Sequence, residues 1–229
     1  MSVPSKPVTA VVIAAGDATR WGDYRGIPKH LVEVGGEPIL HRTARLLKQR
    51  VDTVWVVSKN DARYHQHGAN IYTIEPGPSD ADKFYSSRAI WSGHTILVYG
   101  DCYFTEEALD TITQPVTDWM LYCRPDASEI TGSPYGECWA YSIPEQQLDM
   151  FKQRLIWLAG MHELGETHRC GGWELYRALL GQDVNEHRMT TNYTTIDDWS
   201  EDFDYPRDYD MWLYRRHAAT TTQPKLSAK

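Results

Sequence analysis

A short apolar run near the start of the chain, from Val8 to Ala15, ends directly in a turn of small residues that leads to Arg20. Its apolar and β-branched side chains are typical of a buried strand. A loop of small residues after such a strand lets backbone N–H groups come close to an anion, because no bulky side chain blocks the approach. The stretch therefore predicts an anion site at the end of the first strand.

Two cations follow in the same loop, Arg20 and Lys29. A guanidinium holds two phosphate oxygens at once, and an ammonium group acts as a point charge. Together with the loop N–H groups, they are suited to holding a polyphosphate. Taken by itself, the stretch is also compatible with a plain strand and loop that carries two solvated cations.

Three segments of this stretch together resemble the opening motif of the nucleotidyltransferase family, which includes the sugar-phosphate, molybdenum-cofactor and phosphocholine types. The matching segments are Ala14-Ala15-Gly16-Asp17-Ala18-Thr19-Arg20, Pro28-Lys29-His30-Leu31 and Gly36-Glu37-Pro38-Ile39-Leu40. The main departure is Ala18, which stands where the family has a second glycine. Alanine tolerates a positive φ poorly, so this position bears on how closely the loop can wrap phosphates.

The resemblance implies roles for individual residues. It implies that Arg20 and Lys29 are catalytic, with Arg20 on the β- and γ-phosphates and Lys29 neutralising charge near the α-phosphorus. The nucleotide-binding residues that it implies are Ala14, Ala15, Gly16, Asp17, Ala18 and Thr19. Ser86 joins them through a weaker match of Tyr85-Ser86-Ser87 to phosphocholine cytidylyltransferase-like members; plain helix surface is the alternative there.

Strand-like and helix-like segments alternate along the chain, which predicts right-handed crossovers and a mainly parallel sheet with its ligand at the carboxyl ends of the strands. We expect a three-layer, Rossmann-like α/β fold with helices on both faces of a mixed sheet; the resemblance implies the nucleotide-diphospho-sugar transferase type. The expected strands are 8–15, 53–58, 70–74, 95–99, 119–123, 136–143 and 193–196, and the expected helices are 37–50, 79–91, 105–113, 144–158, 173–180 and 206–217.

Two acids are candidate Mg²⁺ ligands. Asp101 follows an apolar strand and a glycine, and Mg²⁺ prefers one or two carboxylates together with phosphate oxygens and waters. The resemblance implies the same role for this Gly-Asp pair, and it makes Asp204 the second ligand through the string 202–209. Asp197 and Asp198 are rivals of Asp204, whereas Asp208 is expected to interact with the N-terminus of the last helix.

Aromatic residues fall where the resembled family builds its acceptor pocket: Trp139, Tyr141 and Tyr193. Their rings suit stacking on a sugar, a base or a quaternary ammonium group. They are equally compatible with plain strand residues, because aromatic side chains favour strands.

Length and charge limit the remaining possibilities. The 229 residues suit one domain, expected over 8–217, with a loose terminus at 1–7 and a flexible tail at 218–229. A net charge of −8 argues against general nucleic-acid binding. We find no signal peptide and no membrane-spanning run, and the four cysteines form no Cys-x-x-Cys pair, so we expect a cytoplasmic protein.

The expected function is Mg²⁺-dependent nucleotidyl transfer from a nucleoside triphosphate to a phosphorylated small-molecule acceptor, with release of pyrophosphate. A glycosyltransferase of the GT-A type and an inactive nucleotide-binding relative are the alternatives. The chain lacks the zinc-hydrolase, serine-hydrolase, dinucleotide-binding and Walker motifs. Neither the base, the acceptor nor the oligomeric state follows from the sequence.

Overall fold

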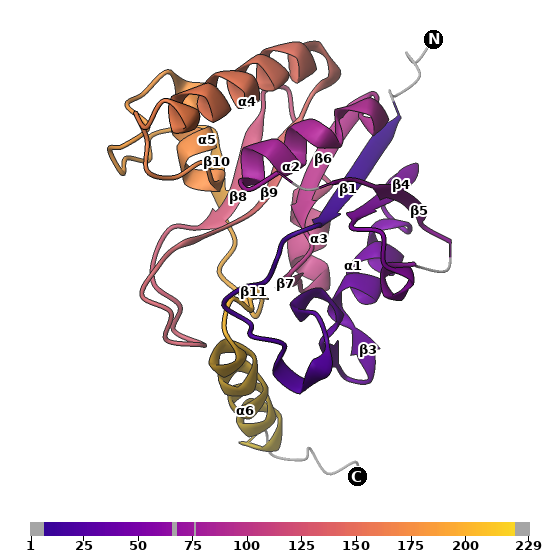
Figure 1. Ribbon diagram of the computed structural model, residues 1–229. Coiled ribbons are helices and arrows are strands. Elements are labelled where there is room, and N and C mark those ends of the chain that lie inside the picture. The colour runs from indigo at the N-terminus through magenta and orange to yellow at the C-terminus, as the bar shows by residue number, and fades with distance from the viewer. Residues whose placement is uncertain (1–6, 66–67, 76, 223–229) are drawn as a thin grey trace.

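The computed structural model describes residues 7–65, 68–75 and 77–222. A seven-stranded sheet in the order β10-β8-β9-β6-β1-β4-β5 forms its centre (Figure 1). Only β9 runs against the other strands of this sheet, because it pairs antiparallel with β6 and with β8. The sheet is therefore mainly parallel, as predicted. Its strands are β1 (Val8–Ala14), β4 (Thr53–Ser58), β5 (Asn70–Thr73), β6 (His94–Tyr99), β8 (Met120–Arg124), β9 (Glu137–Ile143) and β10 (Tyr193–Thr195).

Helices cover both faces of the sheet, as the alternation in the sequence predicts. Along β1, Val11 and Ile13 belong to one core cluster and Ala10 and Val12 to the other, which reflects the two-residue period of a strand. The first cluster includes residues of α2 (Asp80–Ser86), α4 (Leu148–Glu163) and α5 (Gly172–Leu180). The second includes residues of α1 (Ile39–Leu47) and α3 (Glu106–Ile112).

A third cluster lies beyond the carboxyl ends of the central strands. It joins the loop after β1 to α6 (Pro206–Thr222), and its largest members are Trp21, Tyr103, Phe203, Tyr209 and Trp212. Two short antiparallel ladders surround it: β2 (Glu33–Val34) with β3 (Glu37–Pro38), and β7 (Cys102–Tyr103) with β11 (Glu201–Asp202). This cluster ties the last helix to the first loop (Figure 1).

Helix boundaries follow the local capping chemistry. Ser79 and Asp82 form a capping box at the start of α2, and the side chain of Thr105 caps α3. The end of the helix expected over 144–158 is wrong, because α4 continues through Gly160 to Glu163. The glycine that ends α4 is Gly165, at φ +72°, where the amide of Glu166 donates to the carbonyl of Met161 at 2.9 Å in a Schellman motif.

The last helix is longer than expected. It continues past His217 to Thr222, so residues 218–222 of the predicted flexible tail are helical. The rest of that tail, 223–229, and residues 1–6 lie outside the described residues. Within the described ranges, no helix combines the length and apolar character needed to cross a bilayer.

Candidate active site

The loop after β1 offers free backbone donors. In the described part of the chain, the amide N–H groups of Gly16, Asp17, Ala18 and Thr19 donate to no other group. Ala18 has φ +50°, so it adopts the left-handed conformation that its position demands despite its Cβ. Ala14 and Ala15 are buried behind the loop. The side chain of Asp17 pairs with Lys59 at the end of β4.

Lys29 is held by a single 3-10 turn, Lys29–Leu31, that begins after Pro28. Only 7% of Lys29 is exposed, and its Nζ lies 2.5 Å from Oδ2 of Asp101 and 3.0 Å from Oδ1 of Asp204. Arg20 reaches the same acid, with Nη1 2.5 Å from Oδ2 of Asp204. The structure therefore brings together residues from three distant parts of the sequence: Arg20 and Lys29 from the first loop, Asp101, and Asp204.

A glycine brings Asp101 beside the loop. The amide of Gly100 donates to the carbonyl of Ile13 at 2.9 Å, and a Cβ at Gly100 would lie 2.8 Å from that oxygen and 3.0 Å from Cβ of Ala14. Any larger residue would push β6 and β1 apart at this point. The close approach sets Asp101 against the start of the phosphate loop.

Asp202 is an additional acid of the site that the sequence interpretation missed. It lies in β11 opposite Cys102, the residue after Asp101. Potential ligand atoms of Asp101, Cys102 and Asp202 lie within 4.8 Å of one another, and so do those of Glu137, Asp202 and Asp204. Asp202 belongs to both groups. Its Oδ1 is buried and has no hydrogen-bond partner among the described residues.

A signal for Asp202 was present in the sequence. In the string Asp-Phe-Asp, the central Phe203 is fully buried. Residues two apart on an extended segment share a face, so a buried Phe203 places both neighbouring acids on the other side. No comparable pattern identifies Glu137, which lies at the start of β9.

The acids and the cations determine one another's protonation. Burial alone would lower the pKa of Lys29, but the charges of Asp101, Asp202 and Asp204 outweigh it and raise that pKa well above its usual value. Burial opposes ionisation of Asp101, yet Lys29 lowers the pKa of Asp101 to about 2. Burial, with Asp204 close by, raises the pKa of Glu137 to about 8, and burial beside Asp101 raises the pKa of Asp202.

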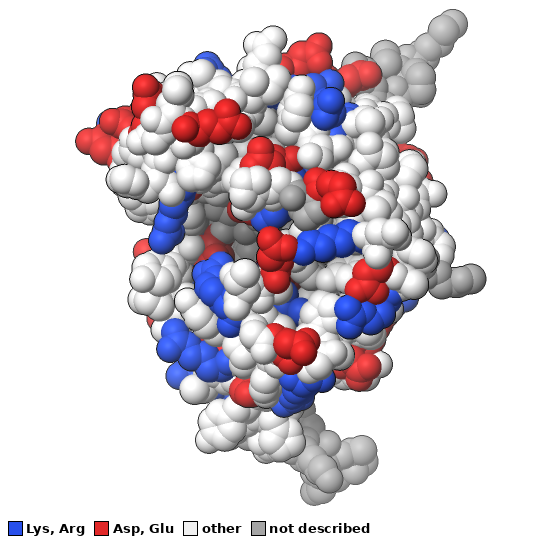
Figure 2. All heavy atoms as spheres, viewed as in Figure 1, with Lys and Arg blue, Asp and Glu red and all other residues white. Residues whose placement is uncertain are grey.

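The site therefore places four carboxyl groups beside two permanent cations, and two of these groups, Asp202 and Glu137, keep their protons more readily than usual. Figure 2 shows a hollow on this face of the molecule, with acidic and basic side chains gathered around it. Carboxylate oxygens are hard ligands, which suit a small divalent cation such as Mg²⁺ or Mn²⁺. The chemistry of these donors fits such an ion.

The rival acids take part in other interactions. Asp198 accepts hydrogen bonds from the hydroxyl of Thr105 and, at 2.6 Å, from the amide of Ser200, while Asp197 is exposed. Asp208 was expected to interact with the N-terminus of the last helix. Its Oδ2 accepts a hydrogen bond from the amide of Tyr205, just before α6, at 2.8 Å. None of these three acids belongs to the carboxylate groups above.

The aromatic residues predicted for an acceptor pocket do not line the site. A bulge in β9 pairs Ala140 with Tyr122 but Cys138 with Cys123, so the strand gains one residue there. As a result Trp139 and Tyr141, both 0% exposed, pack into opposite core clusters. Tyr193 is 37% exposed but lies at the amino end of β10, whereas the site lies at the carboxyl ends of the parallel strands.

The prediction that Ser86 binds the nucleotide gains no support from the place of this residue in the structure. Ser86 is the last residue of α2 and does not line the small cavity, of about 30 Å³, beside the phosphate loop. From α2, that cavity takes Asp80, Lys83 and Phe84, which meet Gly16 and Asp101 there. Asp80 accepts from Lys83 at 3.3 Å and from the hydroxyl of Tyr99 at 3.3 Å. The start of α2, rather than its end, therefore faces the loop.

Comparisons with known proteins agree with this fold. Residues 10–145 match the family model of the MobA-like NTP transferase domain. Among solved structures, CTP:phosphocholine cytidylyltransferase from Streptococcus pneumoniae is similar at a TM-score of 0.60 and 13% identity, covering 92% of this chain and 99% of that one. No curated protein matches the chain.

Two further solved structures are similar over almost their whole length. The inositol-1-phosphate CTP transferase from T. maritima has a TM-score of 0.58 and 16% identity, covering 90% of this chain and 94% of that one. A Mycobacterium tuberculosis protein in complex with manganese has a TM-score of 0.58 and 16% identity, covering 92% and 99%. At these identities the likeness shows the fold alone, and it confirms the predicted fold class.

Proposed function

Since the chain belongs to the family of MobA-like NTP transferase domains, which are enzymes of the nucleotidyltransferase type, we propose that it joins a nucleoside triphosphate to a phosphorylated small molecule and releases pyrophosphate. The observation that carries this proposal is the convergence of Lys29 and Arg20 on Asp101 and Asp204 beside the free amides of the first loop. A departing pyrophosphate needs such donors, and a divalent ion needs such acids.

A divalent metal ion, which we propose to be Mg²⁺, fits the acidic side of the site. Asp101 and Asp204 would hold it, with Asp202 as a further carboxylate whose buried Oδ1 has no partner in the described residues. When bound, such an ion neutralises phosphate charge and polarises the reacting phosphoryl group. The similar M. tuberculosis structure contains manganese, which supports a divalent ion without deciding between the two metals.

The residues of this chain act by positioning and by charge. An oxygen of the acceptor phosphate forms a bond to the α-phosphorus, and the bond from that phosphorus to the β-phosphate oxygen breaks, so its electron pair leaves with pyrophosphate. Arg20 and the amides of residues 16–19 hold the departing oxygens, and Lys29 offsets the charge that grows at the α-phosphoryl group. The acceptor phosphate is already ionised, so the step requires no general base.

The ion pairs of the free protein fit this scheme. Lys29 and Arg20 neutralise Asp101 and Asp204 in the absence of ligand. A bound metal would take over that neutralisation, which frees both cations to interact with phosphate oxygens. We also propose a cytoplasmic setting, because all four cysteines are free thiols, as is usual in a reducing compartment.

The test is an assay of pyrophosphate release. Each of the four ribonucleoside triphosphates is incubated with Mg²⁺ and one acceptor at a time: phosphocholine, inositol 1-phosphate or glucose 1-phosphate. We expect acceptor-dependent release of pyrophosphate with at least one pair. Consumption of sugar nucleotides alone would instead favour the GT-A glycosyltransferase, and Mg²⁺-dependent nucleotide binding without turnover across a wide acceptor panel would favour an inactive relative.

A further inference from the structure

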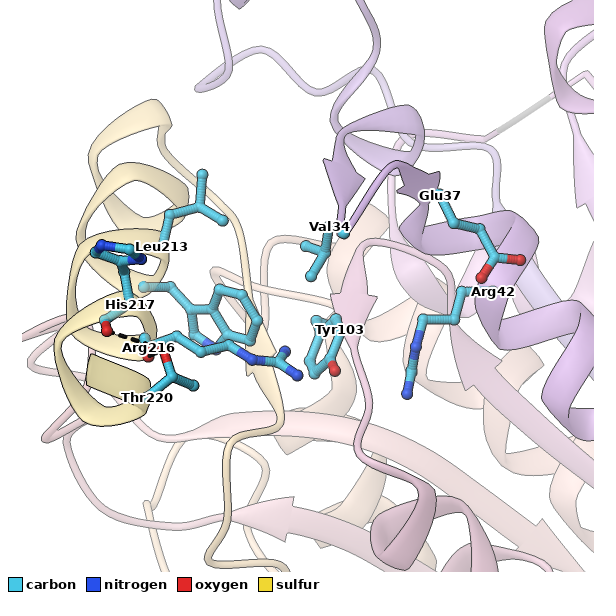
Figure 3. A pocket seen from close by; sticks show the side chains of 10 residues that line it. Val34, Glu37, Arg42, Tyr103, Leu213, Arg216, His217 and Thr220 are labelled. Atoms are coloured by element: carbon cyan, nitrogen blue, oxygen red, sulfur yellow. Dashed lines mark hydrogen bonds between the residues drawn. The ribbon is translucent and has the colours of Figure 1, made fainter. Parts of the chain in front are cut away.

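A second cavity, of about 480 Å³, lies apart from the phosphate loop. Its walls come from α6, the turn between β2 and β3, the first part of α1, and Tyr103 of β7. Figure 3 shows the side chains of α6 on one side, Tyr103 in the middle, and Arg42 with Glu37 on the other side. None of the residues placed in the active site above lines this cavity.

Two guanidinium groups are fixed in this cavity by aromatic rings. Cζ of Arg42 lies 4.7 Å from the centroid of the Tyr103 ring, and Cζ of Arg216 lies 4.9 Å from the same centroid. Arg216 also packs on Trp212, at 4.7 Å. A stacked guanidinium is held flat by the ring while its N–H edge stays available for an acceptor.

Neither guanidinium has a carboxylate partner. Within the described ranges no acidic oxygen lies within 4.0 Å of Arg42 or Arg216. Glu37, the acid in the cavity wall, is already occupied, because both of its oxygens accept from Arg45, at 2.9 and 2.7 Å. The cavity therefore keeps two uncompensated positive charges close to one tyrosine.

Among the described residues, these arginines also have few hydrogen-bond acceptors. Arg42 donates one hydrogen bond, from Nη1 to the carbonyl of Phe104 at 2.5 Å. Nη1 of Arg216 is buried and has no acceptor among the described residues. Buried N–H groups are normally satisfied, so an unpaired one in the wall of a cavity indicates an acceptor that comes from outside the chain.

We propose that this cavity is a second anion site, which binds a phosphorylated small molecule between Arg42 and Arg216. The two guanidiniums flank the Tyr103 ring, and each offers a forked set of donors that matches the oxygens of a phosphate better than those of a single carboxylate. Val34, Trp212 and Leu213 give the cavity an apolar wall for the rest of the ligand. The inference does not rest on the proposed nucleotidyl transfer, because it uses no residue of that site.

Trp212 provides a reporter within the cavity. Its indole N–H donates to the carbonyl of Trp199 at 3.0 Å. The indole N–H resonance of Trp212 is assigned as the one that is missing from the spectrum of Trp212→Phe. Trp21, whose indole donates to the carbonyl of Ile27 at 2.9 Å, reports on the phosphate loop. The experiment titrates the ¹⁵N-labelled full chain with inorganic phosphate and then pyrophosphate, without metal and at constant ionic strength, while both resonances are followed by NMR.

We expect a saturable shift of the Trp212 resonance. Arg216→Gln and Arg42→Gln should each weaken that binding by at least about tenfold, because each removes a charged, forked donor. Arg215→Gln is the matched control, since Arg215 is exposed on the same helix and donates to the carbonyl of Glu129 outside the cavity. It should change the affinity by less than about twofold.

Three results would overturn the proposal: a Trp212 resonance that does not move while Trp21 responds, equal affinity in Arg216→Gln and Arg215→Gln, or a response to acetate as strong as that to phosphate. A well-dispersed spectrum of each variant shows that it is folded. The titration measures binding and not turnover, so its result is independent of the result of the pyrophosphate assay.

Discussion

At the scale of single residues, the most informative side chain is the ammonium group of Lys29. It is almost fully buried, yet it remains charged because Asp101 and Asp204 lie 2.5 and 3.0 Å from it. Such a cation is fixed in place before any ligand arrives. Positive charge that needs no rearrangement is what the transfer of a phosphoryl group requires.

Lys29→Ala should therefore lower turnover by on the order of 10²-fold to 10³-fold, the usual scale for the loss of one such donor. The measurement is the rate of pyrophosphate release at saturating substrates. Lys152→Ala, which alters an α4 residue paired with Asp149, is the control and should leave the rate unchanged. A near-normal rate in Lys29→Ala would remove the catalytic assignment.

Protonation of the buried His94 is expected to cause part of the pH dependence of the protein's stability. His94 is 9% exposed, with Nε2 2.5 Å from the hydroxyl of Ser142, and burial lowers its pKa below the ordinary 6.5. The unfolded chain then binds the proton more readily than the folded one. The contribution to stability is complete above pH 6.5 and is lost as the pH falls from 6.5 through the lowered pKa of the folded state.

Urea denaturation at pH 8 and at pH 5.5 tests this prediction. The wild-type protein should lose more stability between these values than His94→Gln does, because glutamine does not titrate at position 94. His168→Gln, which alters an exposed histidine, should behave like wild type. Identical losses in His94→Gln and wild type would contradict the prediction.

The sequence predicted the outline of the site at this scale but not its full set of residues. The phosphate-loop motif and the Gly-Asp pair pointed to Lys29 and Asp101, because both follow strands whose ends meet at one edge. Asp202 and Glu137 were missed, since they reach the site through a two-residue strand and an antiparallel strand. Pairing between such distant segments leaves little trace in local sequence, apart from the Asp-Phe-Asp alternation that marks Asp202.

At the scale of elements, β11 shows how a short segment is held in place. A buried network joins it to the arm that follows β8: Nη2 of Arg124 lies 2.9 Å from Oε1 of Glu201, and the hydroxyl of Ser128 donates to the other carboxylate oxygen. The Glu201 side chain is 1% exposed and that of Arg124 is 10% exposed. The network thus anchors the residue next to Asp202.

Glu201→Ala should lower the free energy of unfolding by about 3–5 kcal/mol, because it leaves the buried charge of Arg124 without a partner. The double variant Arg124→Met with Glu201→Leu should recover most of that loss, since it removes both charges. Urea denaturation measures all three proteins. A loss below about 1 kcal/mol in Glu201→Ala, which is typical of exposed pairs, would show that the network does not hold β11.

The bulge in β9 marks the limit of pattern-based prediction at this scale. A strict two-residue period would put Trp139 and Tyr141 on one face. The extra residue at the bulge sends them to opposite faces, and both become core residues. No local sequence signal specifies the bulge, whereas the capping box of α2 is formed by two residues only three positions apart.

At the scale of the whole molecule, the fold brings two distant halves of the chain to one edge of the sheet. Arg20 and Lys29 follow β1, Asp101 follows β6, and Asp204 lies just before α6. The third hydrophobic cluster, which includes Trp21, Phe203 and Trp212, packs these segments together. Alternating strands and helices were sufficient to predict that edge, because parallel crossovers leave few other arrangements.

The central claim is that this edge holds a divalent ion between acids of both halves. A titration of the full chain with Mn²⁺, followed by the EPR signal of the free ion, tests it most directly. Asp101→Asn and Asp204→Asn should each weaken binding by at least about tenfold, since carboxylates are the preferred ligands of such ions, while Asp197→Asn should bind like wild type. If Asp101→Asn and Asp204→Asn bound Mn²⁺ as tightly as Asp197→Asn does, the claim would be contradicted.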